Sequence, residues 1–557
     1  MKFTEMKYER IDYAKVRAEL KALTEEMRDA ASFEEAFKVH EKYAEMFHDV
    51  YSMNQICMIR HDIDTTDEFY DKEQEYNDEY VPTIREAQVG YTRALYESPF
   101  KEQFMEKIGP VAYKNMELEL EYFVPEMVPL MQEENALVTR YEKLVATAKI
   151  EWEGEILNLP LMTKHTTSPD RETRKKAFAK TTGFFMENRD QFDEIYDKLV
   201  KNRTAQAKLL GFDSYTKLGY ARMQRNDYGP DEVKAFREEV KKKIVPLATK
   251  AHEARRQRIG VDHLYYYDTI SFPNGNPEPI GTPEEILESG RKMYEELSPE
   301  TGEFFNFMLE NERFDVLGRK TKRNGGYMTS IPNDDNTPFV FANFNKTAGD
   351  VDVITHECGH AFQGYITRKD CDEYRNITME TAEIHSMSME FFTEPWMDKF
   401  FGDRADDYRV YHLEDALTFI PYGCMVDEFQ HIVYANPDMT PEERRMKWVE
   451  LEKEYRPHMD YGDNECYLTG GLWQRQSHIY AMPFYYIDYC LAQTVALEYK
   501  AWMDKDYKAA WNSYIELCKQ GARDFYSNSL PKVGIKVPFE AGCLDETVEV
   551  IGKKMGV

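Results

Sequence analysis

Apolar residues recur at helical spacing through most of this chain, with polar residues on the intervening positions. Several of these stretches begin with the Ser/Thr-x-x-Glu pattern that caps a helix N-terminus, namely Ser32–Glu35, Thr282–Glu285 and Thr440–Glu443. Long amphipathic segments with short connections are typical of antiparallel helix hairpins. The pattern therefore predicts a mainly α fold.

Two stretches have the spacing of strands instead. Apolar and polar residues alternate on both sides of Glu153-Gly154, which predicts a small β-hairpin over residues 149–159. We place a domain boundary there, with residues 1–150 as an N-terminal helical lobe and residues 151–557 as a second domain.

The second such stretch covers residues 319–346. Asn324-Gly325-Gly326 resembles a turn that enters a strand at Tyr327–Ser330, and the aromatic and β-branched run Pro338–Phe344 predicts another strand. We expect a small sheet here, just before the next helix. The strand Pro338–Phe344 either presents a free edge that pairs with an extended peptide, which we favour, or is an ordinary buried strand.

The composition limits the partners. Hydrophobic residues make up 42% and charged residues 31%, and the formal net charge is −30, so we expect no nucleic-acid or anionic-membrane partner. We find no apolar run long enough to span a bilayer and expect no signal peptide in the charged first twenty residues. Eight cysteines without a C-x-x-C pair indicate free thiols in a reducing cytoplasm.

The sequence H-E-x-x-H occurs at His356-Glu357-Cys358-Gly359-His360. Residues four apart share one face of a helix, so His356 and His360 can grip one zinc ion. Glu357 can then act on a water molecule without being a ligand, whereas Cys358 faces away and packs. A helix that carries two histidines by chance is the alternative, but only 13 of 557 residues are histidine.

A catalytic zinc site needs a third protein ligand and one open position. The following helical stretch, residues 379–390, offers Glu380, Glu383 and His385. Spacing leaves all three open and favours Glu383. Asp352 or Glu390 could orient one of the ligand histidines.

A cluster of one histidine and four tyrosines begins at His478. Within it Tyr486 and Tyr489 lie three apart, on one helical face. A phenol donates a hydrogen bond at neutral pH and can stabilise an oxyanion. The alternative is an aromatic core without a catalytic role.

These three motifs, His356–Ala361, Glu383-x-x-Ser386-x-x-x-Glu390 and His478 with Tyr486 and Tyr489, together resemble the thimet-oligopeptidase family of zinc metallopeptidases, most closely its oligoendopeptidase F branch. The resemblance extends from about residue 150 to residue 557. It implies that Glu383 is the third metal ligand, that His478 faces the substrate, and that Tyr486 and Tyr489 are the cleft tyrosines. Because the spacing from histidine to tyrosine is one residue shorter than in mammalian members, the decisive donor stays open among Tyr485, Tyr486 and Tyr489.

The resemblance also implies a fold and a function. We expect a two-lobed helical ellipsoid with a deep channel that admits short unstructured peptides, and one Zn²⁺ per chain. The expected activity is zinc-dependent hydrolysis of internal peptide bonds in oligopeptides, with Glu357 as general base, in cytoplasmic peptide catabolism. One alternative is a dipeptidyl carboxypeptidase, which would need a cationic anchor such as Lys322, Arg323 or Arg475. The other is a zinc-containing peptide-binding protein without turnover.

Overall fold

Helices form most of the chain in the computed structural model, which describes residues 1–319, 321–323 and 325–557. The predicted mainly α class is confirmed. The three capping patterns begin helices as predicted. Ser32 caps α2 (Phe33–Ile63), Thr282 caps α13 (Pro283–Leu297) and Thr440 caps α20 (Pro441–Tyr455), each by accepting a hydrogen bond from the amide three residues later.

The chain forms two compact units, and each is discontinuous in sequence. The first consists of Met1–Glu121, Glu278–Ala405 and Trp502–Ile535, and the second of Tyr122–Pro277, Asp406–Ala501 and Lys536–Val557. The N-terminal helices therefore share a unit with the H-E-x-x-H motif. The domain boundary near residue 150 and the ellipsoid with its channel stay predictions.

The first unit holds all three strands of the predicted sheet. Besides α2 and α13, its elements are α1 (Tyr13–Asp29), α3 (Glu68–Tyr80), α4 (Arg85–Tyr96), α5 (Lys101–Ile108), α6 (Pro110–Glu121), α14 (Pro299–Glu310), β3 (Phe314–Leu317), β4 (Tyr327–Ile331), β5 (Thr337–Phe344), α15 (Gly349–Ile366), α16 (Asp372–Arg375), α17 (Met379–Phe392), α18 (Asp398–Phe401) and α24 (Tyr526–Lys532).

The second unit is helical apart from one hairpin. Besides α20, its elements are α7 (Val128–Ala146), β1 (Ile150–Trp152), β2 (Glu155–Leu157), α8 (Leu159–Thr166), α9 (Arg171–Glu187), α10 (Arg189–Leu209), α11 (Thr216–Arg222), α12 (Pro230–Ile259), α19 (Ala405–Ala435), α21 (Glu465–Leu468), α22 (Ser477–Ala481) and α25 (Asp545–Met555). Helix α23 (Tyr486–Gln520) continues into the first unit and is interrupted at Asp506, where φ is −154°.

The predicted hairpin is confirmed. Strands β1 and β2 pair antiparallel, with Trp152 opposite Glu155. The two turn residues, Glu153 and Gly154, have φ of 50° and 90°. Positive φ at both central positions matches the right-handed twist of the flanking strands, which explains why a glycine stands in the turn.

The sheet of the first unit has the order β3-β5-β4. Strand β5 is therefore central, parallel to β3 and antiparallel to β4. The expectation of a free edge on Pro338–Phe344 is wrong, because hydrogen bonds to both neighbours occupy its two edges. Strand β4 is the edge strand next to it. The turn expected before it includes Asn324, which lies outside the described residues.

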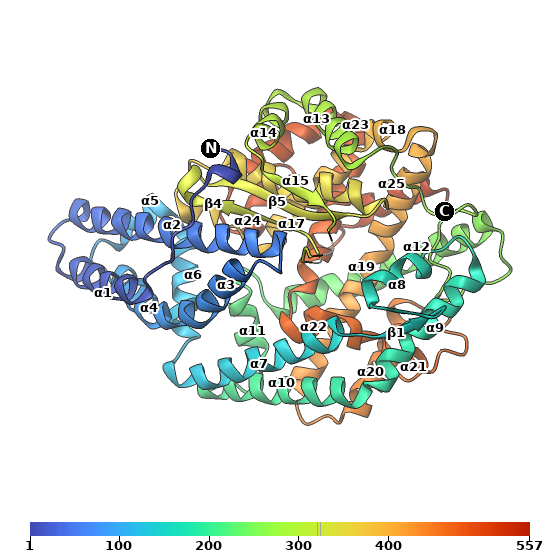
Figure 1. Ribbon diagram of the computed structural model, residues 1–557, viewed down its shortest axis with the longest axis horizontal. Coiled ribbons are helices and arrows are strands. Elements are labelled where there is room, and N and C mark those ends of the chain that lie inside the picture. Colours follow the sequence, from blue (N-terminus) through green and yellow to red (C-terminus); the bar gives the residue numbers. More distant parts are fainter. Residues whose placement is uncertain (320, 324) are drawn as a thin grey trace. The chain divides into compact units, whose positions relative to one another are not determined.

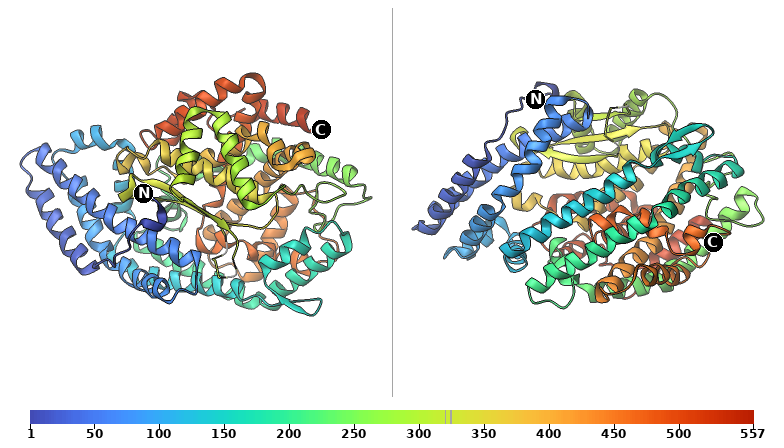
Figure 2. Two further views of the ribbon diagram at one scale, coloured as in Figure 1. Left: turned by 45° about the horizontal axis from the view of Figure 1, so that its top comes forward. Right: turned by 60° about the horizontal axis from the view of Figure 1, so that its bottom comes forward.

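The sheet separates α2 from α15 within this unit (Figure 1, Figure 2). Odd-numbered side chains of β4 point towards α2: the Thr329 hydroxyl donates to Gln55, and the Tyr327 hydroxyl donates to Asp62. Phe339 and Phe341 of β5 join the same buried cluster as Ile56 and Ile59. The alternation of a strand leaves Met328 and Ser330 of β4 on the opposite face, towards α15.

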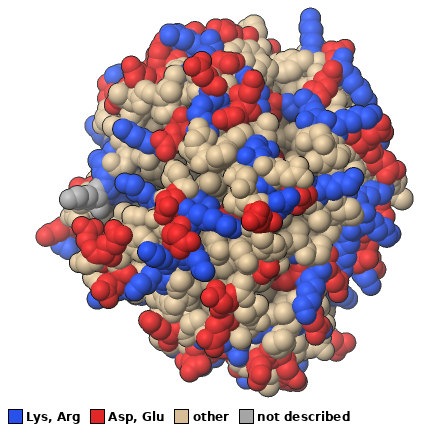
Figure 3. Space-filling view, turned by 90° about the vertical axis from the view of Figure 1, so that its right-hand side faces the viewer, with Lys and Arg blue, Asp and Glu red and all other residues tan. Residues whose placement is uncertain are grey.

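Charges are mixed on the surface. On the face shown in Figure 3, Lys and Arg side chains are interspersed with Asp and Glu. Among the helices of the described residues, none combines the length and apolar character needed to cross a bilayer.

Candidate active site

Helix α15 begins directly after β5, and its first turn holds the connection in place. The carboxylate of Asp350 accepts hydrogen bonds from the backbone amides of Asn345 and Lys346, at 2.8 and 2.9 Å. A carboxylate at a helix N-terminus is also favoured by the helix dipole. The sheet therefore fixes where the H-E-x-x-H segment starts.

Helices α15 and α17 bring His356, His360 and Glu383 together. Nε2 of His356 lies 3.4 Å and Nε2 of His360 lies 3.5 Å from Oε2 of Glu383. One ligand atom from each residue lies within 4.8 Å of the other two. No other such group of histidine, cysteine or acidic side chains occurs among the described residues.

This donor set fits a zinc ion. Ligand atoms at about 2.0–2.1 Å from a tetrahedral metal are about 3.3–3.4 Å apart, close to the two distances to Glu383. Two imidazoles and one carboxylate also match the His₂Glu set of zinc peptidases and leave one position open. The residues present can hold the metal without rearrangement.

The electrostatics of the triad favour a cation. Burial alone would lower the pKa of His356, but the carboxylates of Glu383 and Glu390 outweigh burial and raise that pKa well above its ordinary value. Burial would raise the pKa of Glu383, and the two histidines lower it well below the ordinary value instead. Two carboxylates thus surround a point between the imidazoles where positive charge is stabilised.

Glu390 takes the orienting position for His356. Its Oε1 accepts a hydrogen bond from Nδ1 of His356 at 2.6 Å. This contact fixes the ring and leaves Nε2 facing Glu383. Of the two acidic residues expected from the sequence to orient a ligand histidine, the structure places Glu390 there.

A close crossing of the two helices makes the triad possible. A Cβ at Gly359 would lie 2.6 Å from both the carbonyl oxygen of His385 and Cα of Ser386. Glycine is required here because the backbones of α15 and α17 touch. Ser386 donates to the carboxylate of Glu383 at 3.1 Å, and Tyr514 of α23 donates to the carbonyl of His385 at 2.8 Å.

The other residues of the two motifs have separate surroundings. Glu357 is half-buried on α15, and Cys358 is fully buried on the side away from the triad, as expected. His385 is buried, with Nδ1 3.5 Å from Sγ of Cys518. Neither Glu380 nor His385 belongs to the group of three ligands, so the structure brings only Glu383 of the three alternatives to the two histidines.

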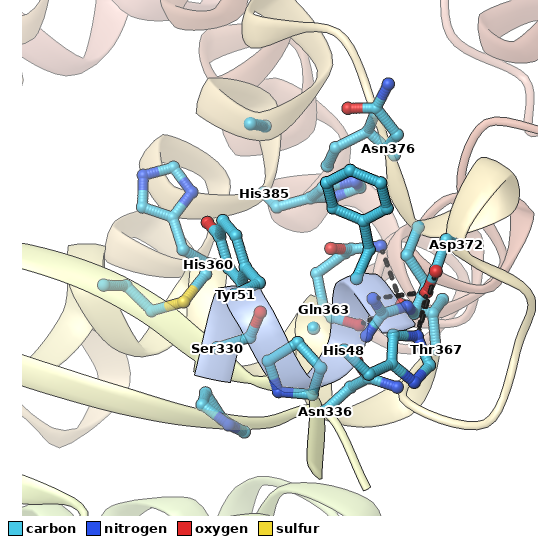
Figure 4. Close-up of a pocket in the computed structure, with 18 residues that line it drawn as sticks. His48, Tyr51, Ser330, Asn336, His360, Gln363, Thr367, Asp372, Asn376 and His385 are labelled. Carbon is cyan, nitrogen blue, oxygen red and sulfur yellow. Dashed lines mark hydrogen bonds and ion pairs between the residues drawn. The ribbon is translucent and has the colours of Figure 1, made fainter. Parts of the chain in front are cut away.

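A cavity of about 460 Å³ lies beside the triad within the first unit. His360 and Gln363 of α15, Met328 and Ser330 of β4, and Tyr51 of α2 line it. In the view of Figure 4, His360 stands at one side and the pair His48–Asp372 at the other. A space of this size can take one large side chain of a peptide.

His478 and the tyrosines form a cluster in the second unit. The ring of His478 lies 5.0 Å from that of Tyr486 and 5.9 Å from that of Tyr489, both edge-on. Gln476 contacts Nδ1 of His478 at 2.8 Å and accepts from the Tyr422 hydroxyl at 2.9 Å. Tyr486 and Tyr489 are half-buried, whereas Tyr485 is 5% exposed.

The two residues between these tyrosines face the core. Ile487 and Asp488 are fully buried, and the carboxylate of Asp488 pairs with Arg225 at 2.6 Å. Their presence in the motif therefore leaves Tyr486 and Tyr489 on the more exposed side of α23. Burial raises the pKa of Tyr486 above its ordinary value, which keeps its phenol protonated.

The three cations considered as anchors differ in availability. Lys322 is buried and bonds to Asp315 and to the backbone of the sheet, and Arg323 pairs with Asp62 at 3.0 Å. Both are structural. Arg475 is exposed and lines a cavity of the second unit.

Sequence reasoning missed several residues that shape the site. Tyr294, whose hydroxyl donates to the carbonyl of Ile354 at 2.9 Å, supports α15 from α13. Tyr514 supports α17, and Tyr51 and His48 line the cavity. They lie far from the motifs in sequence, and no spacing pattern marks them.

Comparison with known families matches two parts of the chain. Residues 3–123 match the Peptidase M3 N-terminal domain, and residues 164–549 match Peptidase family M3. Oligopeptidase PepF of Bacillus subtilis (strain 168) is 24% identical over 403 residues, which cover 69% of this chain and 59% of that protein. The matched part thus spans less than two thirds of this relative. An oligoendopeptidase F homolog of Borreliella burgdorferi is 22% identical, over 74% of this chain and 71% of its own length.

Solved structures match over the whole chain. PZ peptidase A, determined with an inhibitor, is 47% identical with a TM-score of 0.94, and the match covers 100% of this chain and 99% of that one. A Bacillus anthracis protein solved as a candidate oligoendopeptidase F is 40% identical with a TM-score of 0.90, covering 100% and 98%.

Proposed function

The chain belongs to peptidase family M3, and we propose on that basis that it is a zinc-dependent endopeptidase that cleaves internal bonds of short, unstructured peptides. The observation that carries the proposal is the triad: His356, His360 and Glu383 offer three ligand atoms within 4.8 Å, with Glu357 next to the first of them. The similarity to oligoendopeptidase F relatives supports it.

His356, His360 and Glu383 would hold the metal. When bound, a zinc ion acts as a Lewis acid and lowers the pKa of a water molecule towards about 7. Glu357 takes the proton of the attacking water as general base and passes it to the leaving amine. Glu390 holds the ring of His356 in place through the bond to Nδ1.

His478, Tyr486 and Tyr489 are the proposed donors to the oxyanion of the tetrahedral intermediate. The two half-buried phenols stay protonated at neutral pH and can donate, and Gln476 contacts Nδ1 of His478. The more buried Tyr485 is the weaker candidate.

Strand β4 and the cavity beside His360 are suited to hold the peptide. The outer edge of β4 has no strand partner among the described residues, so an extended peptide can pair with its backbone irrespective of sequence. Met328 and Ser330 of the same strand line the cavity, which can receive one side chain. Backbone pairing explains how one site can accept many peptides.

We also propose a reducing compartment such as the cytoplasm. All eight cysteines are free, and seven of them are buried. A net charge of −30 supports peptides rather than nucleic acids or anionic membranes as partners.

The test uses a quenched peptide about ten residues long with both termini blocked. The enzyme should cleave inside it, lose activity with a chelator and regain it with stoichiometric zinc. Cleavage of only unblocked peptides, two residues from the C-terminus, would identify the dipeptidyl carboxypeptidase instead. Zinc-dependent binding without cleavage of any peptide would identify the non-catalytic alternative.

The Glu357→Gln variant separates chemistry from metal binding. It should retain one zinc per chain and lose about 10²-fold or more in kcat, because a positioned general base contributes 10²–10⁴. Metal content measured by mass spectrometry is the control. Full activity in a zinc-loaded Glu357→Gln protein would refute the role of Glu357.

A further inference from the structure

A second cavity, of about 350 Å³, lies within the second unit and has no part in the chemistry described above. Its lining combines three guanidinium groups and two imidazoles with tyrosine rings and the apolar side chains of Phe178, Met459 and Leu472. The five basic residues are His252, Arg255, Arg456, His458 and Arg475. In a chain with a net charge of −30, this concentration of cations needs a physical explanation.

The acidic residues of the lining do not neutralise these cations. Asp268 is held by Arg171 at 2.7 Å and by Arg174 at 3.0 Å, and both oxygens of Glu414 accept from Arg258 at 2.6 Å. These three arginines lie outside the lining. The third acidic residue, Asp415, is exposed.

Two of the guanidinium groups lack an anionic partner. Arg456 donates to Glu452 at 3.2 Å. Arg255 donates to Nδ1 of His252 at 3.1 Å, a neutral acceptor. Among the residues that the structure describes, no carboxylate lies within ion-pair distance of Arg255 or Arg475. Half-buried cations without a counter-charge are costly, and an anion between them would offset that cost.

The histidines provide neutral donors rather than further charge. Burial, followed by the charge of Arg255, lowers the pKa of His252 to about 3, and burial with Arg456 and Arg255 lowers that of His458 to about 3. Because Nδ1 of neutral His252 accepts from Arg255, its proton is on Nε2, which can donate.

The cavity adjoins the His478 cluster within the same unit. Arg475 lies three residues before His478, and Gln476 between them contacts Nδ1 of His478 at 2.8 Å. Tyr422 donates to Gln476 and its ring lies 5.9 Å from that of Tyr486. An anion held by Arg475 is therefore next to the proposed oxyanion donors.

We propose that this cavity binds a carboxylate near the C-terminal end of a peptide substrate, with Arg255 and Arg475 as its cationic partners. Guanidinium groups bind carboxylates through paired hydrogen bonds, and the aromatic and apolar walls can receive the adjoining side chain. The acidic residues of the same lining disfavour a doubly charged phosphate. The inference rests on the proposed function only in taking the ligand to be a substrate.

Binding to the metal-free protein tests the site without any turnover. The probes are three fluorescent peptides of one sequence: a free acid ending in Gln, the amide ending in Gln, and the amide ending in Glu. The first should bind roughly tenfold or more tightly than the second, as expected for charge-assisted hydrogen bonds. Tight binding of the third assigns the site to a side-chain carboxylate, and weak binding assigns it to the main-chain terminus.

The variant Arg475→Gln should weaken binding of the carboxylate peptides to the level of the Gln amide, and Arg255→Gln should do the same. Arg475 is exposed, so its substitution leaves the core intact. The matched control is Arg256→Gln on the same helix α12, since Arg256 pairs with Glu253 and does not line the cavity. Equal affinity of all three peptides for the wild-type protein, or an equal loss for all three in Arg475→Gln, would overturn the proposal.

Kinetics with the zinc-loaded enzyme extend the test. The carboxylate should lower KM and leave kcat nearly unchanged, because the anchor acts on binding and not on the reacting bond. A carboxylate preference in binding without cleavage of any peptide would refute the proposed function and keep the site. Chelator-sensitive cleavage with identical KM for acid and amide would do the reverse.

Discussion

Nδ1 of His356 donates to Glu390 across 2.6 Å, and Nε2 of the same ring lies 3.4 Å from Glu383. Both carboxylates come from α17, seven residues apart and therefore on one face of that helix. A single helix thus supplies one metal ligand and the group that orients another.

Replacing Glu390 should weaken metal binding. Without this acceptor the ring of His356 is free to rotate, and such orienting partners contribute about 10–100-fold in metal affinity. We expect Glu390→Ala to raise the zinc Kd by that factor in competition with a chromophoric chelator. Asp352→Asn is the comparison, and a larger effect of Asp352→Asn would reverse the assignment.

Adding a methyl group at Gly359 should force α15 and α17 apart. The new Cβ meets backbone atoms at 2.6 Å, which cannot move as a side chain can. We expect Gly359→Ala to lower the free energy of unfolding by about 1–3 kcal/mol and to weaken zinc binding. Urea denaturation of the metal-free protein measures the first effect.

Gly364→Ala is the matched control on the same helix. Its Cβ would approach only the flexible end of Met328, at 4.0 Å. We expect no destabilisation, and a gain of up to about 1 kcal/mol, because alanine is the better helix former. Equal losses in the two variants would mean that helix propensity, and not the crossing, decides.

Removing a phenol tests the oxyanion donors. Loss of one such donor costs about 10²–10³ in rate, so we expect Tyr486→Phe or Tyr489→Phe to lower kcat by that factor with little change in KM. Tyr485→Phe should stay within a few-fold of wild type because Tyr485 is only 5% exposed. Steady-state kinetics on one blocked peptide ranks all three, and a dominant effect of Tyr485→Phe would contradict this ranking.

Glu498 should make stability depend on pH. Burial raises its pKa to about 7, although the backbone amide and charge of Lys536 act in the opposite direction. The folded state therefore binds a proton that the unfolded state releases above a pKa of about 4.3. Stability from this group is complete below that value and falls as pH rises to about 7, by up to about 3 kcal/mol.

The measurement is the free energy of unfolding at pH 5 and pH 8 for the wild type and Glu498→Gln. The variant keeps the shape and removes the titration, so the decrease between the two pH values should be smaller in it. The same decrease in both proteins would show that other groups cause it.

The local parts of the site follow from the sequence because they depend on helix geometry alone. Residues four apart on one helix must share a face, so the pairing of His356 with His360 needs no knowledge of the fold. The capping patterns at Ser32, Thr282 and Thr440 succeed for the same reason.

The rest depends on how distant segments meet. Strand β5 has the apolar run of a strand, but whether its edge is free depends on β3 and β4 pairing with it, which the run cannot show. Glu390 and Asp352 are equally well placed on their own helices, and the crossing at Gly359 decides between them. Tyr51 reaches the cavity from α2, about 300 residues before His360, and carries no pattern of its own.

The support that Tyr514 gives to the carbonyl of His385 joins residues 129 positions apart. During synthesis the ribosome therefore completes both metal-holding helices well before the segment that braces them, Trp502–Ile535, has emerged. A nascent or truncated chain can carry every ligand and still lack the finished scaffold. Proteolytic capacity is thereby withheld until translation is almost over, which spares neighbouring unfolded chains from an active enzyme in their midst.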